Sequence, residues 1–234
     1  MSTSLPLADR FNRPLGVLRL SLTARCNLAC PYCRPDVDDP PGLLTLEQQM
    51  RVIRVASRLG TQTLRLTGGE PLLSRRLLPL LEAVAEARRR RSDPMAGLEV
   101  VALTSNGVLL SEPMARSLRA AGLNRITISL DAAEGEAAAR MAGLQGGAVA
   151  GDRLVRKVQD GISAARAAGF DPSAGELKLN AVIQRGMNDD QLLPLAGLAR
   201  QQGVELRLIE FMDVGNRNQW RLNQVLPAAQ MVEH

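Results

Sequence analysis

Three cysteines lie close together near the N-terminus of this chain, at Cys26, Cys30 and Cys33. The sequence has no other cysteine, and its one histidine is His234. An odd, clustered set of thiols is a poor disulfide framework and a good site for a metal or a cluster. The common [4Fe–4S] site uses four cysteine thiolates, so three would leave one iron with an open coordination position. A zinc site is the alternative reading, although zinc would need a fourth ligand.

A second candidate segment, Gly68-Gly69-Glu70-Pro71, follows an apolar run that ends at Leu66. Glycines allow a backbone to approach a ligand closely. A carboxylate such as that of Glu70 accepts hydrogen bonds from an ammonium group. The alternative reading of this segment is a plain turn.

The elements that position these residues alternate between two types. Six apolar runs predict strands, at 17–22, 63–66, 98–103, 125–130, 177–183 and 204–209. Helical patterns lie between them: one capped by Thr45 with Gln48, one capped by Ser74, and three more at 112–121, 152–168 and 190–202, each followed by glycine. The Gly- and Ala-rich segment 132–152 is expected to be a flexible insertion.

This alternation favours right-handed β–α units and a parallel sheet. The chain has 234 residues, which is short for an eight-fold barrel of about 250. We therefore expect one α/β domain, an open partial (β/α)6 barrel with outer helices. Polar residues follow the predicted strands, so they should gather at the carboxyl edge of the sheet, where such folds build active sites.

Composition excludes several classes of protein. Aromatic residues make up only 2%, so the chain lacks the stacking platform of a nucleic-acid-binding protein. No apolar run is long enough to span a membrane, and the first 13 residues do not resemble a signal peptide. We expect a cytoplasmic protein. The net charge is +5 and the pI is about 9.8. We expect the basic run 88–91 to be the solvated end of a helix.

With an aromatic residue before its last cysteine, the Cys-x3-Cys-x2-Cys pattern resembles that of the radical S-adenosylmethionine (SAM) superfamily. Within it, the chain resembles the GTP 3′,8-cyclases of molybdenum-cofactor biosynthesis. The resemblance covers about residues 9–220 and is carried by segments 18–23, 65–71, 104–107, 128–131, 178–180, 188–191 and 209–216.

The resemblance implies a role for each matching position. Cys26, Cys30 and Cys33 would bind one [4Fe–4S] cluster, and no protein side chain would be catalytic in its own right, because the radical arises at the cluster. The positions that match SAM contacts are Tyr32, Gly68, Gly69, Glu70, Ser129 and Met212. The positions that match GTP contacts are Arg19, Arg65, Thr104 and Lys178. From the residues alone, the alternative readings are surface or ion-paired arginines for Arg19 and Arg65 and a core aromatic for Tyr32, and Lys178 could equally be a solvated strand start.

The implied reaction is the first step of molybdenum-cofactor biosynthesis. Reductive cleavage of SAM gives a 5′-deoxyadenosyl radical, which takes the 3′ hydrogen of GTP, and the substrate radical attacks C8 to give (8S)-3′,8-cyclo-7,8-dihydroguanosine 5′-triphosphate. The implied partners are GTP, an electron donor such as flavodoxin or ferredoxin, and a second copy of the chain in a homodimer. A membrane and nucleic acid are not implied. A non-catalytic partner protein is disfavoured, because the three cysteines and the Gly-Gly-Glu-Pro segment are intact.

The sequence departs from the family at its C-terminus. Members carry a further region with a second three-cysteine cluster, an arginine-rich stretch and a Gly-Gly tail, none of which has a counterpart here. We expect one radical SAM core domain over 1–234, with the barrel at about 14–212 and a tail at 213–234. The chain is then a truncated product, half of a split enzyme completed by a C-terminal half, or a one-cluster radical SAM enzyme with another substrate. A smaller departure is Arg34, where the family usually has an apolar residue.

Overall fold

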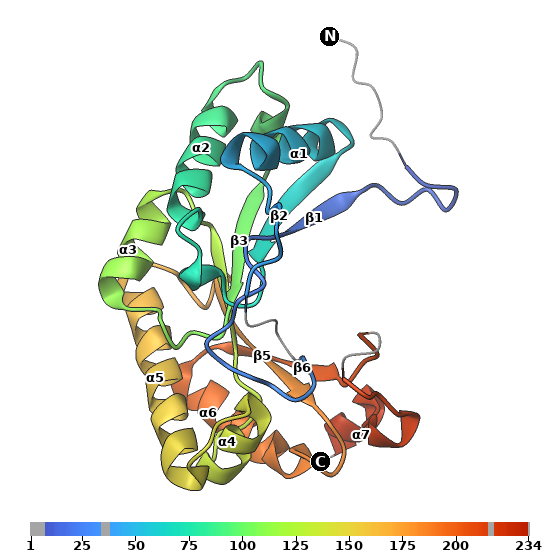
Figure 1. The fold of residues 1–234 in the computed structure, drawn as a ribbon, viewed down its shortest axis with the longest axis vertical. Coiled ribbons are helices and arrows are strands. Elements are labelled where there is room, and N and C mark those ends of the chain that lie inside the picture. Colours follow the sequence, from blue (N-terminus) through green and yellow to red (C-terminus); the bar gives the residue numbers. More distant parts are fainter. Residues whose placement is uncertain (1–7, 34–37, 215–217, 234) are drawn as a thin grey trace.

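The computed structural model describes residues 8–33, 38–214 and 218–233. Within these residues six strands form one sheet in the order β1-β2-β3-β4-β5-β6, and every neighbouring pair is parallel. The strands are β1 (Gly16–Ser21), β2 (Thr61–Thr67), β3 (Val100–Ser105), β4 (Arg125–Ser129), β5 (Leu177–Ile183) and β6 (Glu205–Glu210). The sheet curves without β6 pairing with β1, so the expected open partial (β/α)6 barrel is confirmed (Figure 1).

Helices cover the outer, convex face of the sheet (Figure 1). They are α1 (Leu46–Arg58), α2 (Leu77–Arg89), α3 (Glu112–Ala120), α5 (Gly147–Ala167) and α6 (Leu192–Gln202). Helix α4 (Gly135–Ala142) packs against α5, and the short α7 (Ala228–Glu233) packs against β6. Single 3₁₀ turns lie at Pro71–Leu73, Pro94–Gly97, Asp189–Gln191 and Leu222–Gln224. No helix in the described part of the chain is long and apolar enough to cross a membrane.

The core lies between the sheet and these helices. Leu64 and Leu66 of β2, Leu103 of β3 and Ile126 of β4 are fully buried in it. Successive side chains of a strand point to opposite faces, so the residues between these apolar ones face the concave interior. The strand pattern therefore leaves the inner face free for polar side chains.

The capping box predicted at the start of α1 is present. The Thr45 hydroxyl accepts a hydrogen bond from the Gln48 backbone, and the Gln48 side chain accepts one from Thr45 N. The prediction for α2 was wrong, because its N-cap is Arg76 rather than Ser74. Ser74 instead ends the preceding 3₁₀ turn, and its hydroxyl accepts a hydrogen bond from Arg76 N.

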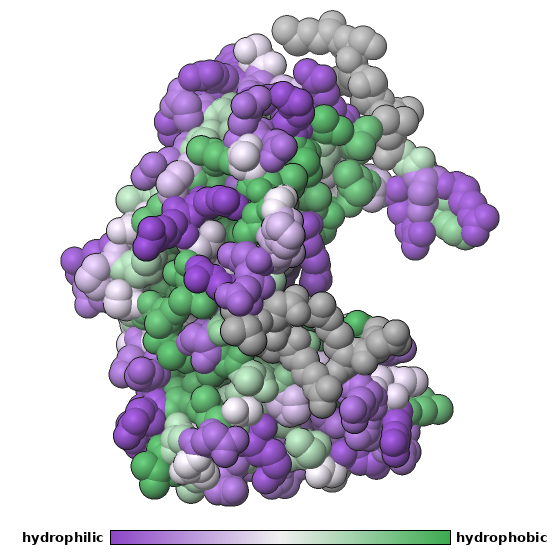
Figure 2. Space-filling view, viewed as in Figure 1, coloured by the Kyte–Doolittle hydropathy of each residue, from purple (hydrophilic) through white to green (hydrophobic). Residues whose placement is uncertain are grey.

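The expectation of a flexible insertion at 132–152 was also wrong. This segment contains α4 and the start of α5, which pack closely against each other. A Cβ on Gly151 would lie 1.7 Å from Gly135 O, so these glycines serve the close approach of two helices. Figure 2 shows one face of the molecule, on which hydrophobic residues lie among hydrophilic ones.

The basic run 88–91 is only partly solvated. Arg89 and Arg90 pair with Glu86 on the surface. Arg88 instead donates hydrogen bonds to Asn124 Oδ1 and Glu99 O. Four positions discussed from the sequence lie outside the described residues: Arg34, Gly215, Asn216 and His234.

Candidate active site

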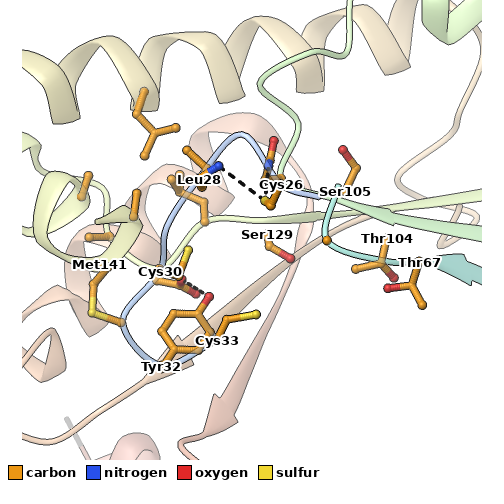
Figure 3. Close-up of a pocket in the computed structure, with 18 of the residues that line it drawn as sticks. Cys26, Leu28, Cys30, Tyr32, Cys33, Thr67, Thr104, Ser105, Ser129 and Met141 are labelled. Atoms are coloured by element: carbon orange, nitrogen blue, oxygen red, sulfur yellow. Dashed lines mark hydrogen bonds between the residues drawn. The ribbon is translucent and has the colours of Figure 1, made fainter. Parts of the chain in front are cut away.

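A pocket lies at the carboxyl edge of the sheet, as expected from the polar residues that follow the strands (Figure 3). Its walls come from the segments after β1, β2, β3 and β4 and from α4 and α5. The predicted site residues that line it are Cys26, Cys30, Tyr32, Cys33, Gly68, Gly69, Thr104 and Ser129. The fold therefore gathers the cysteines and most of the residues assigned to SAM around one space.

The Gly-Gly pair holds the segment that leads into the cysteines. Gly69 N donates to Thr23 O at 2.8 Å, and Glu70 N donates to Arg25 O at 2.8 Å. A Cβ on Gly69 would lie 2.3 Å from Arg25 O. Gly68 has a φ of +149°, and a Cβ there would lie 2.5 Å from Thr23 O. Glycine is required at both positions because the chain's own backbone approaches them so closely.

The Glu70 carboxylate does not face the pocket in this structure. The residue is 0% exposed. Its Oε1 accepts hydrogen bonds from Ser105 Oγ at 2.9 Å and from Leu72 N at 3.0 Å, and its Oε2 accepts one from Asn106 N at 2.8 Å. Burial raises the pKa of Glu70, and these hydrogen bonds oppose the shift. Glu70 joins the ends of β2 and β3, so its predicted contact with an ammonium group stays a prediction.

The three thiols fit an iron–sulfur cluster by their chemistry. None is in a disulfide, and all line the same pocket. Burial raises the pKa of Cys30 to about 12, with the negative charge of Asp131 adding to the effect. No Lys, Arg or His is among the described residues that line the pocket, so the positive charge that would stabilise these thiolates is best supplied by a bound metal.

The sulfurs do not converge on one point. The described residues contain no group of three His, Cys, Asp or Glu side chains close enough to hold a single metal ion. In Figure 3, the three cysteine side chains are spread around the pocket, and Cys30 and Cys33 lie beside Tyr32. A cluster with several irons needs such a spread, because each thiolate binds a different iron.

Tyr32 is fixed by a buried network at the end of β4. Its hydroxyl donates to Asp131 Oδ2 at 2.6 Å, and Asp131 Oδ1 accepts from Val182 N at 2.8 Å. Asn188 Nδ2 donates to Asp131 O at 2.6 Å. Burial raises the pKa of Asp131 to about 6 in spite of these hydrogen bonds. Tyr32 is thus anchored at the pocket wall rather than packed as an ordinary core aromatic.

Helix α4 forms another wall of the pocket. Its residues Ala138, Met141 and Ala142 line the space, and Ala29 N donates to Ala142 O at 3.0 Å. Gly143, which ends the helix with a φ of +65°, lies so close that a Cβ would be 2.1 Å from Ala29 O. The segment expected to be flexible therefore supports the loop that carries Cys26, Cys30 and Cys33, which we call the cysteine loop.

A second group of site residues lies on the inner face of the sheet. Strand pairing aligns Arg19 with Arg65, and aligns both Arg65 and Arg125 with Ala102 of β3. Burial lowers the pKa of Arg65, and the charges of Arg19, Arg207 and Arg125 lower it further. Within the described residues, neither Arg19 nor Arg65 forms an ion pair with a carboxylate. The Nε atoms of Arg65 and Arg125 are buried without a hydrogen-bond partner.

The same face holds one carboxylate between two further cations. Lys178 Nζ lies 2.6 Å from Glu205 Oε2, and Arg207 Nε lies 2.6 Å from Glu205 Oε1. The hydrogen bonds from Lys178 and then Arg207 lower the pKa of Glu205 to about 2. Lys178 is only 8% exposed, so the alternative of a solvated strand start was wrong. We call Arg19, Arg65, Arg125, Lys178 and Arg207 the inner cationic face.

Met212, like Glu70, is an assigned SAM position that belongs to neither group. It follows β6, is 58% exposed and does not line the pocket. Arg125 and Arg207 were not predicted as site residues, and Asn106 and Asp131 were expected at the carboxyl edge of the sheet without a specific role. For the two arginines the available signal was a charged residue in an apolar strand, the same signal that marked Arg65. For Asn106 and Asp131 it was only their place directly after a strand end.

Comparison with known proteins gives a consistent result. The family model described as the Radical SAM superfamily matches residues 20–199. The chain is 88% identical to the GTP 3′,8-cyclase of Synechococcus sp. (strain CC9605), over 100% of this chain and 67% of that protein. It is 69% identical to the GTP 3′,8-cyclase of Parasynechococcus marenigrum (strain WH8102), over 99% of this chain and 67% of that protein. The chain thus spans about two thirds of the length of these relatives.

Solved structures support the fold. Streptococcus suis SuiB bound to S-adenosylmethionine superposes with a TM-score of 0.65 over 89% of this chain and 43% of that one. The sequences are 16% identical, so this likeness concerns the fold alone.

Proposed function

Because the chain belongs to the radical SAM superfamily and, within it, to the GTP 3′,8-cyclase family, we propose that it acts in the cyclisation of GTP by a SAM-derived radical. The observation that carries this proposal is the gathering of three cysteine side chains, the Gly-Gly turn and Ser129 in one pocket, beside an inner face rich in cations. Family membership favours an iron–sulfur cluster over the zinc site that the cysteines alone left open.

The cofactors are one [4Fe–4S] cluster and SAM. Cys26, Cys30 and Cys33 hold the cluster, and when both cofactors are bound they supply the 5′-deoxyadenosyl radical. Tyr32, Gly68, Gly69 and Ser129 line the same pocket, and there they would contact SAM. The apolar side chains of Leu28, Met141 and Leu154 also line it and exclude water. For Glu70 we propose a supporting role at the strand ends, and for Met212 a SAM contact from beyond β6.

The inner cationic face binds the triphosphate of GTP. Arginine and lysine side chains are the usual partners of phosphate oxygens, and guanidinium groups bind them in a bidentate manner. Arg19, Arg65 and Arg125 have no carboxylate partner among the described ion pairs, so their charge is available to an anion. Thr104 lines the pocket at the end of β3 and lies between the two groups along the sheet. These residues orient the ribose toward the cysteine pocket.

Other parts of this proposal concern the whole protein. We propose that residues 1–234 act as a single radical SAM core domain in the cytoplasm. Flavodoxin or ferredoxin is the proposed electron donor. A homodimer, or a complementing C-terminal half, is the proposed assembly.

The test is anaerobic. The protein is reconstituted with iron and sulfide, reduced with dithionite, and given SAM and GTP, and the products are separated by chromatography. We expect 5′-deoxyadenosine together with cyclised GTP. 5′-Deoxyadenosine without cyclised GTP would limit this chain to SAM cleavage, and neither product from a preparation with about four irons per chain would refute the proposal.

A further inference from the structure

Asn106 reaches from the end of β3 to the first cysteine of the pocket. Its Nδ2 donates to Cys26 Sγ at 3.7 Å and to Asn27 Oδ1 at 2.8 Å. The backbone N of Leu28 also donates to this sulfur, at 3.4 Å. Leu28 belongs to the cysteine loop itself, whereas Asn106 donates from the segment that follows β3.

The orientation of the Asn106 amide is fixed by its other contacts. Its Oδ1 accepts a hydrogen bond from Val108 N at 3.1 Å, so the NH₂ group must point the other way, toward Cys26 and Asn27. A flipped amide would place two donors together at Val108 and an acceptor against Asn27 Oδ1. The direction of the N–H···S hydrogen bond therefore follows from the network.

Glu70 holds the backbone of Asn106 in place. Its Oε2 accepts from Asn106 N at 2.8 Å, while Oε1 is held by Ser105 Oγ and Leu72 N. A fully buried carboxylate with three donors is a rigid support. Glu70, Asn106 and Cys26 thus form one connected chain of contacts from the Gly-Gly-Glu-Pro turn to a cluster ligand.

We propose that Asn106 is a positioning residue that sets the reduction potential of the cluster through its hydrogen bond to Cys26. Hydrogen bonds to cysteine sulfur are one of the features that set cluster potentials. A donor stabilises the sulfur more when the cluster has gained an electron, because the sulfur then carries more negative charge. Removing the Asn106 donor therefore lowers the potential and makes the cluster harder to reduce.

The main test variant is Asn106→Asp. It keeps the shape of the side chain and the oxygen that Val108 N requires, but it replaces the donor facing Cys26 with an acceptor. Asn106→Ala removes the donor without adding charge. The matched control is Asn27→Ala, which removes the neighbouring acceptor and leaves the donor on the sulfur.

The measurement is a redox titration of the reconstituted cluster followed by electron paramagnetic resonance, without SAM or GTP. We expect Asn106→Asp to shift the equilibrium about tenfold toward the oxidised cluster, about 59 mV for one electron. Asn106→Ala should shift it less in the same direction, and Asn27→Ala should match the wild type. Circular dichroism checks that all variants are folded.

An unchanged or raised potential in both Asn106 variants would overturn the inference, and so would an equal shift in Asn27→Ala. The inference rests on the cluster site of the proposed function, but its failure is distinguishable. A wild-type protein that assembles no cluster refutes the proposed function itself, whereas an unshifted potential refutes only the role of Asn106.

Discussion

The contact between α4 and the cysteine loop can be tested by placing a methyl group at Gly143. The Cβ of Gly143→Ala would lie 2.1 Å from Ala29 O, where the loop donates its hydrogen bond to Ala142 O. Gly203 provides a matched control, because it ends α6 with a similar φ of +59° and its Cβ would meet nothing closer than 3.9 Å. Both variants therefore carry the same backbone strain, and only one disturbs the loop.

The expected magnitudes follow from that difference. A left-handed conformation costs a residue with a Cβ about 1–2 kcal/mol, so Gly203→Ala should lower the free energy of unfolding by that amount. Gly143→Ala must also move Ala29 away, which sacrifices a backbone hydrogen bond with a net contribution of about 0.5–1.5 kcal/mol. We expect a total loss of about 1.5–3.5 kcal/mol for Gly143→Ala, as the sum of these two contributions.

Two assays separate the strain from the loop displacement. Urea unfolding of the metal-free protein gives the two free energies, and iron analysis after reconstitution gives the cluster content. Gly143→Ala should bind less iron than the wild type, whereas Gly203→Ala should bind the same amount. Equal stability and equal iron content in the two variants would show that α4 does not support the cysteine loop.

Three further predictions concern the two groups of site residues. Tyr32→Phe and Asp131→Asn should each weaken SAM binding, and the double variant should be little worse than either single one, because both remove the same hydrogen bond; calorimetric titration of the three variants gives the coupling. Glu205→Gln should strengthen GTP binding and make it more sensitive to salt, because Lys178 and Arg207 lose their carboxylate partner; equilibrium binding at two ionic strengths checks this, and weaker binding would contradict it. Folding lowers the pKa of Glu205, so its ionised form contributes fully to stability above pH 4.5, the ordinary pKa, and this contribution is lost as the pH falls toward about 2. The free energy of unfolding of the wild type and of Glu205→Gln, measured across that pH range, should therefore differ less and less as the pH falls.

The strands and the cysteine pocket could be predicted from the sequence because their signals are local. All six predicted strands are present, and their bounds differ from the prediction by at most two residues. The apolar pattern marks each strand, and a parallel sheet brings the carboxyl ends of its strands to one edge. The grouping of Cys26, Gly69 and Ser129 around one pocket follows from that geometry.

Other features depend on tertiary contacts that the sequence does not display. Glycines in 132–152 indicate flexibility when read locally, but Gly143 and Gly151 are there because other backbone lies within van der Waals reach. Arg125 belongs to the inner cationic face only through the register between β3 and β4. Glu70 has the residue type of an ammonium ligand, but the fold commits both of its oxygens to Ser105, Leu72 and Asn106.

The consecutive order of the strands also has a consequence for how the protein matures. Each new β–α unit adds to the one made just before it, and chains of this kind can fold from the N-terminus during synthesis. The cysteines belong to the first unit, yet the pocket around them needs Asp131 and α4 from the fourth. A ribosome-bound chain that has not yet released α4 therefore exposes its thiols without the walls that surround them. We expect iron and sulfide to be inserted only after that helix has emerged, so the earliest-made ligands are among the last parts of the site to be completed.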